Sequence, residues 1–141
     1  MKILVLNGPN LNLLGTRDPE VYGSTTLADV NQMLENEFPN YEFDFFQSNV
    51  EGELIDRIHS SMHDGTEAII ANFGGYTHTS VALRDALEPV SFPKVEVHIS
   101  NIHAREEFRE KSITGKVMNG IITGFGVNSY VLGVQAIEQL I

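Results

Sequence analysis

Lys2-Ile3-Leu4-Val5-Leu6 is the stretch of sequence that decides the fold. It is a short continuous run of aliphatic residues, which is typical of a strand buried on both faces of a parallel sheet. A polar stretch over residues 7–25 follows it, and Thr26-Leu27-Ala28-Asp29 then has the pattern of a capping box that opens a helix. A buried strand followed by a capped helix predicts the first β–α unit of a parallel sheet.

Strand and helix patterns alternate through the rest of the chain. Four more segments have strand patterns: Tyr41–Gln47, Glu67–Phe73, Lys94–Ile99 and Gly120–Phe125. Helices are predicted over residues 27–38 and 50–63, Thr79–Leu87 and Val127–Ile141, with a short charged helix or turn at Ala104–Lys111. Apolar spacing in the last helix predicts an inward face made of Tyr130, Val131, Val134, Ile137 and Ile141.

These elements predict an α/β fold in which one five-stranded parallel sheet is covered by helices on both faces, a three-layer sandwich. Alternating aromatic residues in Tyr41–Gln47 indicate a more exposed edge strand. Pairing that strand outside the first gives the strand order 2-1-3-4-5. Because there is no repeat, linker or low-complexity segment, residues 1–141 are predicted to form a single domain.

Composition excludes several classes of protein. The formal net charge of −10, from 19 acidic and 9 basic residues, argues against a nucleic-acid partner, because phosphate contacts require a basic face. The absence of cysteine removes thiolate metal sites. No apolar run approaches the ~20 residues of a membrane span, and Met1 leads directly into a strand with no room for a signal peptide. We therefore expect a cytoplasmic protein with no membrane partner.

Unusual polar residues follow three of the predicted strands. Asn7-Gly8-Pro9-Asn10 comes after the first strand, Asn72 and residues 74–80 after the third, and His98 and Ser100 end the fourth. The carboxyl ends of these strands meet beside the point where the strand order reverses, which is where ligands bind in open parallel sheets. The sequence therefore predicts a ligand site at this edge.

The connection after the first strand is too long for a simple turn and is bounded by Gly15 and Gly23, which indicates a lid. It carries Arg17 and Tyr22. A tyrosine acts as a base near neutral pH only if its pKa falls from about 10 to about 7, which requires roughly 4 kcal/mol of preference for the phenolate. A neighbouring cation such as Arg17 can supply this preference. The alternative is that Arg17 pairs on the surface and Tyr22 only covers the core.

His98 can transfer a proton at neutral pH, and Glu96 lies on the same face of the strand, where it can hold one tautomer of the imidazole. The alternative is a core histidine bonded to a backbone carbonyl. Asn72 either bonds a ligand hydroxyl or closes the turn into Gly74. His78 precedes hydroxyl residues that can hold ligand oxygens or simply cap a helix.

Arg105 and Arg109 are four residues apart, which would place them on one face of a helix. They are suited to receive a carboxylate, or they only pair with Glu106 and Glu107. His59 and His63 have no further ligands at metal-site spacing, so no metal site is predicted.

Dinucleotide and phosphate-loop signatures are absent. Lys2, Lys94, Lys111 and Lys116 are the only lysines, and Lys94 lies at the amino end of the fourth strand, the wrong end for the site. These observations predict chemistry without a cofactor or a lysine imine.

Three blocks of sequence resemble the type II 3-dehydroquinate dehydratase family. They are NGPNLNLLGTRDPEVYG at residues 7–23, NFGGYTHTSVALRDAL at 72–87 and EVHISNIHAREEFR at 96–109. The resemblance extends over the whole chain and implies a flavodoxin-like fold. It also implies dehydration of 3-dehydroquinate to 3-dehydroshikimate in the shikimate pathway, without a cofactor, in a homododecamer built as a tetramer of trimers.

The resemblance further implies a role for each matching residue. Tyr22 corresponds to the tyrosinate base, Arg17 to the lid arginine that lowers its pKa, His98 to the acid that protonates the departing hydroxyl, Glu96 to the partner that orients it, and Asn10 to the residue that holds a water. The residues that correspond to substrate-binding positions are Asn72, His78, Ile99, Ser100, Arg105 and Arg109, with Asp85 contributed to a neighbouring subunit's site. Asp18 and Phe73 depart from the family pattern without touching the chemistry.

Non-catalytic modules of similar architecture are the rival interpretation. A phosphoacceptor receiver needs acidic residues where this chain has Asn7, Asn10 and Asn72. A flavin carrier needs a phosphate loop rich in serine and threonine, whereas residues 7–15 are rich in asparagine, leucine and glycine. The placement of Tyr22 on a lid and His98 on a strand instead suits an anti elimination, with the base and the acid on opposite faces of a ring.

Overall fold

Five parallel strands form one sheet in the part of the chain that the structure describes. The computed structural model describes residues 1–16, 20 and 23–141. The strands are β1 (Lys2–Asn7), β2 (Glu42–Gln47), β3 (Ala68–Asn72), β4 (Lys94–His98) and β5 (Gly120–Thr123), in the order β2-β1-β3-β4-β5. All four strand pairs are parallel. The predicted order is confirmed, including the half-buried aromatic strand β2 at one edge.

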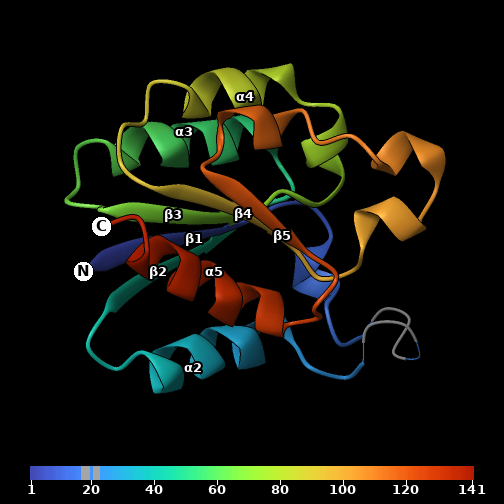
Figure 1. Ribbon diagram of the computed structural model, residues 1–141, viewed down its shortest axis with the longest axis horizontal. Coiled ribbons are helices and arrows are strands. Elements are labelled where there is room, and N and C mark those ends of the chain that lie inside the picture. The colour runs from blue at the N-terminus through green and yellow to red at the C-terminus, as the bar shows by residue number, and fades with distance from the viewer. Residues whose placement is uncertain (17–19, 21–22) are drawn as a thin grey trace.

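Helices cover both faces of the sheet, as Figure 1 shows. Helices α2 (Leu27–Glu37) and α5 (Asn128–Glu138) lie on one face, and α3 (Glu51–Ser61) and α4 (Val81–Leu87) lie on the other. Each face of the sheet has its own hydrophobic core, and alternate residues of β1 belong to each. Ile3 and Val5 pack toward α2 and α5, and Leu4 and Leu6 pack toward α3 and α4. This alternation explains why residues 3–6 of β1 are all apolar and confirms the three-layer sandwich.

Three predicted helical segments differ from the structure in their bounds or type. The third helix starts at Val81 rather than Thr79, because Ser80 is extended and its hydroxyl caps the helix by accepting from the Leu83 amide. The segment predicted as a short charged helix or turn forms two 3₁₀ turns, Ile102–Ala104 and Glu107–Arg109. Extended backbone at residues 105 and 106 separates these turns, so the two arginines do not share a helical face.

The chain's last helix is shorter than predicted. It ends at Glu138, and Ile141 is 72% exposed rather than turned inward. Tyr130, Val134 and Ile137 are fully buried, in agreement with the prediction for that face. No helix in the described ranges is long and apolar enough to cross a membrane.

The hydroxyl of Tyr130 joins α5 to the ends of two strands. It donates to Asn7 Oδ1 at 2.5 Å and accepts from Asn72 Nδ2 at 3.0 Å, and all three side chains are buried. Close approach between the same strand ends requires glycine at position 8, where a Cβ atom would lie 2.4 Å from the Phe73 carbonyl oxygen. The ends of β1 and β3 are therefore held in fixed positions at the carboxyl edge of the sheet.

We predict that Tyr130→Phe lowers the free energy of unfolding by about 1–3 kcal/mol, because it leaves two buried asparagine groups without their partner. Urea denaturation with an unchanged m-value measures this loss. Tyr41→Phe is the matched control, since the Tyr41 hydroxyl donates to Glu138 at the surface. Equal stability of the two variants would contradict a structural role for the Tyr130 hydroxyl.

Candidate active site

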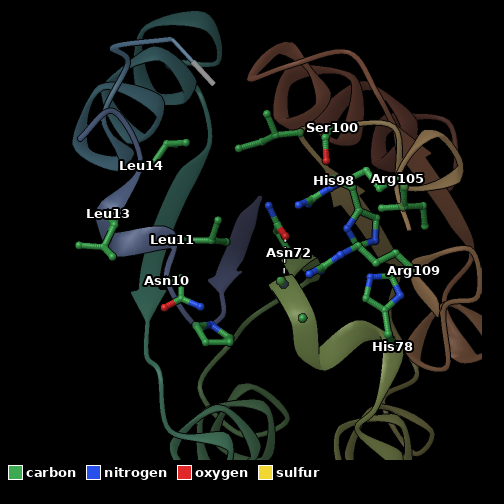
Figure 2. A pocket seen from close by; sticks show the side chains of 15 residues that line it. Asn10, Leu11, Leu13, Leu14, Asn72, His78, His98, Ser100, Arg105 and Arg109 are labelled. Atoms are coloured by element: carbon green, nitrogen blue, oxygen red, sulfur yellow. Dashed lines mark hydrogen bonds between the residues drawn. The ribbon is translucent and has the colours of Figure 1, made fainter. Parts of the chain in front are cut away.

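A pocket of about 210 Å³ lies at the carboxyl ends of β1, β3 and β4. It is smaller than the roughly 300–1,000 Å³ pockets of drug-sized ligands, so it suits a small molecule. Figure 2 shows side chains from three segments facing one another across it. The described residues that line it are Pro9, Asn10, Leu11, Leu13, Leu14, Asn72, Gly74, Gly75, His78, His98, Ile99, Ser100, Ile102, Arg105 and Arg109. The structure therefore has a pocket at the edge where the sequence predicts a ligand site.

One wall of the pocket is the turn after β1. Asn10 adopts a left-handed backbone with φ of 70°, a conformation that asparagine tolerates better than most residues. The backbone N–H of Asn10 donates to Asn49 Oδ1 at 2.9 Å, and this hydrogen bond connects the turn to the loop after β2. Leu11, Leu13 and Leu14 complete the wall with apolar surface (Figure 2).

His98 and Glu96 form a buried pair beneath the opposite wall. The distance between His98 Nε2 and Glu96 Oε2 is 2.8 Å, and Glu96 is fully buried. The partner of the imidazole is thus a carboxylate and not the backbone carbonyl of the alternative interpretation. Burial alone would raise the pKa of Glu96, but the hydrogen bond and charge of His98 and the hydroxyls of Thr114 and Ser112 outweigh it and lower that pKa. Glu96 is therefore an ionised acceptor at neutral pH.

His78 stands beside His98, with ring centroids 6.4 Å apart (Figure 2). Its Nδ1 lies 2.8 Å from the carbonyl oxygen of Lys111. Because a carbonyl only accepts, Nδ1 carries the hydrogen, and in the neutral ring Nε2 is left as an acceptor. His78 can therefore accept a hydrogen bond from a ligand hydroxyl.

Asn72 closes the turn, which is one of the two roles that the sequence left open, and its side chain also lines the pocket. Its Oδ1 accepts from the Gly74 amide at 3.2 Å and so closes the turn after β3. Its Nδ2 donates one hydrogen to Tyr130, and the side chain also lines the pocket. The second Nδ2 hydrogen remains for a ligand oxygen.

Positive charge enters the pocket from the two 3₁₀ turns after β4. Arg105 and Arg109 both line it, although they do not share a helix. Arg109 Nε also forms an ion pair with Glu106 Oε2 at 3.2 Å at the surface. Arg109 therefore both lines the pocket and makes the surface ion pair that the sequence offered as the alternative. Ile99 and Ser100 lie between these turns and His98, and their carbonyls accept from the Gly126 amide and the Thr123 hydroxyl, respectively.

The predicted site residues still to be accounted for are Arg17, Tyr22 and Asp85. Arg17 and Tyr22 lie outside the described residues. Asp85 is on α4, where it pairs with Arg84 at 3.1 Å and its side chain is 62% exposed, away from this pocket. His59 and His63 are exposed, and the described part of the chain contains no group of three or more potential metal ligands.

Two kinds of residue around the site were not predicted. Ser112 and Thr114 contact Glu96 from segments 16 and 18 residues away, and no local pattern in the sequence signals such contacts. The apolar wall of Leu11, Leu13 and Leu14 had a signal, since leucines in an otherwise polar loop need a surface to cover.

Comparison with known proteins identifies the family. The family model described as Dehydroquinase class II matches residues 1–138. The chain belongs to this family. A 3-dehydroquinate dehydratase of Pelodictyon phaeoclathratiforme is 53% identical over 97% of this chain and 91% of its own length. One of Polynucleobacter asymbioticus is 55% identical over 95% and 91%.

The chain also shares the fold of the class II dehydroquinases. The crystal structure of the type II dehydroquinase from Butyrivibrio crossotus superposes with a TM-score of 0.95 at 45% identity, covering 98% of this chain and 97% of that one. The family resemblance and the flavodoxin-like architecture expected from the sequence are thereby confirmed.

Proposed function

We propose that this class II dehydroquinase converts 3-dehydroquinate to 3-dehydroshikimate by an anti elimination of water through an enolate, as a step of the shikimate pathway. The family membership, and the 3-dehydroquinate dehydratase activity for which the relatives are named, support the reaction. The observation that carries it is the His98–Glu96 pair at the wall of a small pocket that also holds Asn72, His78 and two arginines.

The elimination needs a base and an acid on opposite sides of the substrate ring. Tyr22, as its phenolate, takes the proton from C2, and the electron pair left behind forms the enolate with the C3 carbonyl. The enolate then collapses to the enone, and the C1 hydroxyl leaves with a proton from His98 as water. Asn10 holds a water against the enolate oxygen, and Arg17 stabilises both the phenolate and the enolate.

Other tyrosines are poor candidates for the base. Burial raises the pKa of Tyr130, and the hydrogen bond to Glu138, with partial burial, raises the pKa of Tyr41. Tyr76 donates its hydroxyl hydrogen to the carbonyl of Asn49 at 2.9 Å. The base is therefore assigned to Tyr22 on the basis of the sequence motif, and no group that would form a cofactor site or an imine is required.

Substrate binding follows from the chemistry of the pocket wall. Arg109 and Arg105 offset the charge of a carboxylate in a chain whose net charge is −10. The backbone amides of Ile99 and Ser100, with the Ser100 hydroxyl, bind that carboxylate, and Asn72 and His78 bind the ring hydroxyls.

Assembly and location complete the proposal. Residues 1–141 act as one domain within a cytoplasmic homododecamer, a tetramer of trimers. The exposed side chain of Asp85 on α4 is available to reach the site of a neighbouring subunit. No nucleic acid or membrane takes part.

The function is tested by mixing the protein with 3-dehydroquinate and following the absorbance of the enone. We expect the enone to appear, and we expect borohydride treatment in the presence of substrate to leave the activity unchanged, because no lysine imine forms. Absence of enone at any pH would refute the dehydration. Inactivation by borohydride would refute the enolate route.

The base assignment is tested by Tyr22→Phe, which we expect to abolish kcat while substrate still binds, since only the proton acceptor is lost.

Arg17→Ala should lower kcat strongly and move the onset of activity to higher pH, because the phenolate loses its neighbouring cation. Steady-state kinetics across pH, with substrate binding by calorimetry, measures both. Near-normal turnover of Tyr22→Phe, or an unchanged pH profile of Arg17→Ala, would contradict these roles.

A further inference from the structure

Two hydroxyl groups from outside the strand hold the carboxylate of Glu96. Thr114 Oγ1 donates to Glu96 Oε1 at 2.5 Å, and Ser112 Oγ donates to Oε2 at 2.7 Å, the same oxygen that His98 contacts. Thr114 is fully buried. Both hydroxyl residues belong to the segment that follows the two pocket arginines, so they connect that segment to the carboxyl end of β4.

The direction of each hydrogen bond in this cluster can be assigned. An ionised Glu96 can only accept hydrogen bonds, so the Ser112 and Thr114 hydroxyls each donate their single hydrogen to it. The Thr114 oxygen, 2.9 Å from Thr77 Oγ1, therefore accepts from Thr77, while the Ser112 oxygen accepts from the Gly115 amide at 2.8 Å. No hydroxyl hydrogen in the cluster is left to rotate.

The same logic decides the state of His98. Its Nε2 faces a carboxylate oxygen and must be an N–H donor, which leaves Nδ1 as the ring nitrogen available to the pocket. Among the described residues, the other titratable or charged groups that face His98 are His78, from the turn after β3, and the two arginines that line the same pocket. These groups do not contact the carboxylate, so the orientation of Glu96 depends on its two hydroxyl donors.

We propose that Thr114 and Ser112 are positioning residues, which lock the Glu96 carboxylate so that it selects the Nε2–H tautomer of neutral His98 and directs Nδ1 into the pocket, where protonation of Nδ1 gives the imidazolium that donates this proton to the departing hydroxyl. Without the Thr114 hydroxyl, Oε1 loses its described donor in a site that water does not solvate. The carboxylate then turns to share the remaining donors, and the imidazole is no longer held in one tautomer. The catalytic consequence of this loss rests on the proposed dehydration, but the tautomer does not.

The test uses three variants of the full chain. Thr114→Val removes the hydroxyl with little change of shape, and Thr114→Ser restores it. Thr66→Val is the matched control, because the Thr66 hydroxyl also donates to a carboxylate, that of Asp64 at 2.6 Å, but before β3 at the opposite end of the sheet. Two-bond proton–nitrogen correlation spectra of ¹⁵N-labelled protein, at a pH where imidazole is neutral, report the tautomer of His98 without substrate.

We expect wild type, Thr114→Ser and Thr66→Val to show His98 as the single Nε2–H tautomer and Thr114→Val to show a mixture. In the enone assay, Thr114→Val should lose about tenfold in kcat with little change in KM, a part of the roughly 10²–10⁴-fold that a positioned acid contributes. Thr114→Ser should regain most of that loss.

A single Nε2–H tautomer in Thr114→Val, or a kcat equal to that of Thr66→Val, would overturn the inference. If Thr114→Val does not fold, Ser112→Ala replaces it and is judged by the same two outcomes. If the wild type does not dehydrate 3-dehydroquinate, the proposed function fails, and the spectra still decide the positioning.

Discussion

The buried charge of Glu96 is the constraint on which the carboxyl edge of this fold depends. An isolated carboxylate in a protein interior costs several kcal/mol, and only a full set of donors makes it tolerable. Here the donors come from His98 on the same strand and from Ser112 and Thr114 in a later segment. The chain between β4 and β5 must therefore close over the strand end before the charge can be accommodated, and this closure also brings the arginine-bearing turns to the pocket.

Two buried hydrogen-bond clusters, one around Tyr130 and one around Glu96, support the same edge of the parallel sheet. The Tyr130 hydroxyl binds the amides that end β1 and β3, which stabilises the floor of the pocket from below. The Glu96 cluster does the same for β4 from the other face. The side chains that face the ligand are thus held by buried partners behind them, and such support keeps catalytic groups in place more firmly than loop contacts alone.

The architecture and the position of the site could be predicted because both follow from short-range patterns. Apolar runs such as Lys2–Leu6 identify buried strands, and parallel topology alone dictates that the polar residues after β1, β3 and β4 converge. The pairing of Glu96 with His98 follows from the two-residue period of a strand.

What could not be predicted depends on contacts between distant segments. Helical spacing of Arg105 and Arg109 predicted one helix, but Arg105 and Glu106 take extended backbone and the segment forms two turns whose arginines still face the pocket. Ser112 and Thr114 have no periodic relation to Glu96, so their contact with it emerges only from the folded chain. The exposed end at Ile141 shows that apolar spacing continues past the last residue that the core covers.

The central claim is that Glu96 is a buried carboxylate kept ionised by its three donors. A ¹³C NMR titration of the Glu96 side-chain carboxyl, assigned by comparison with Glu96→Gln, tests it most directly. We expect Glu96 to ionise with a pKa below the ordinary glutamate value of 4.5, because its donors outweigh the effect of burial. A pKa at or above 4.5 would contradict this expectation, since burial would then prevail and the carboxylate could not hold His98 as described.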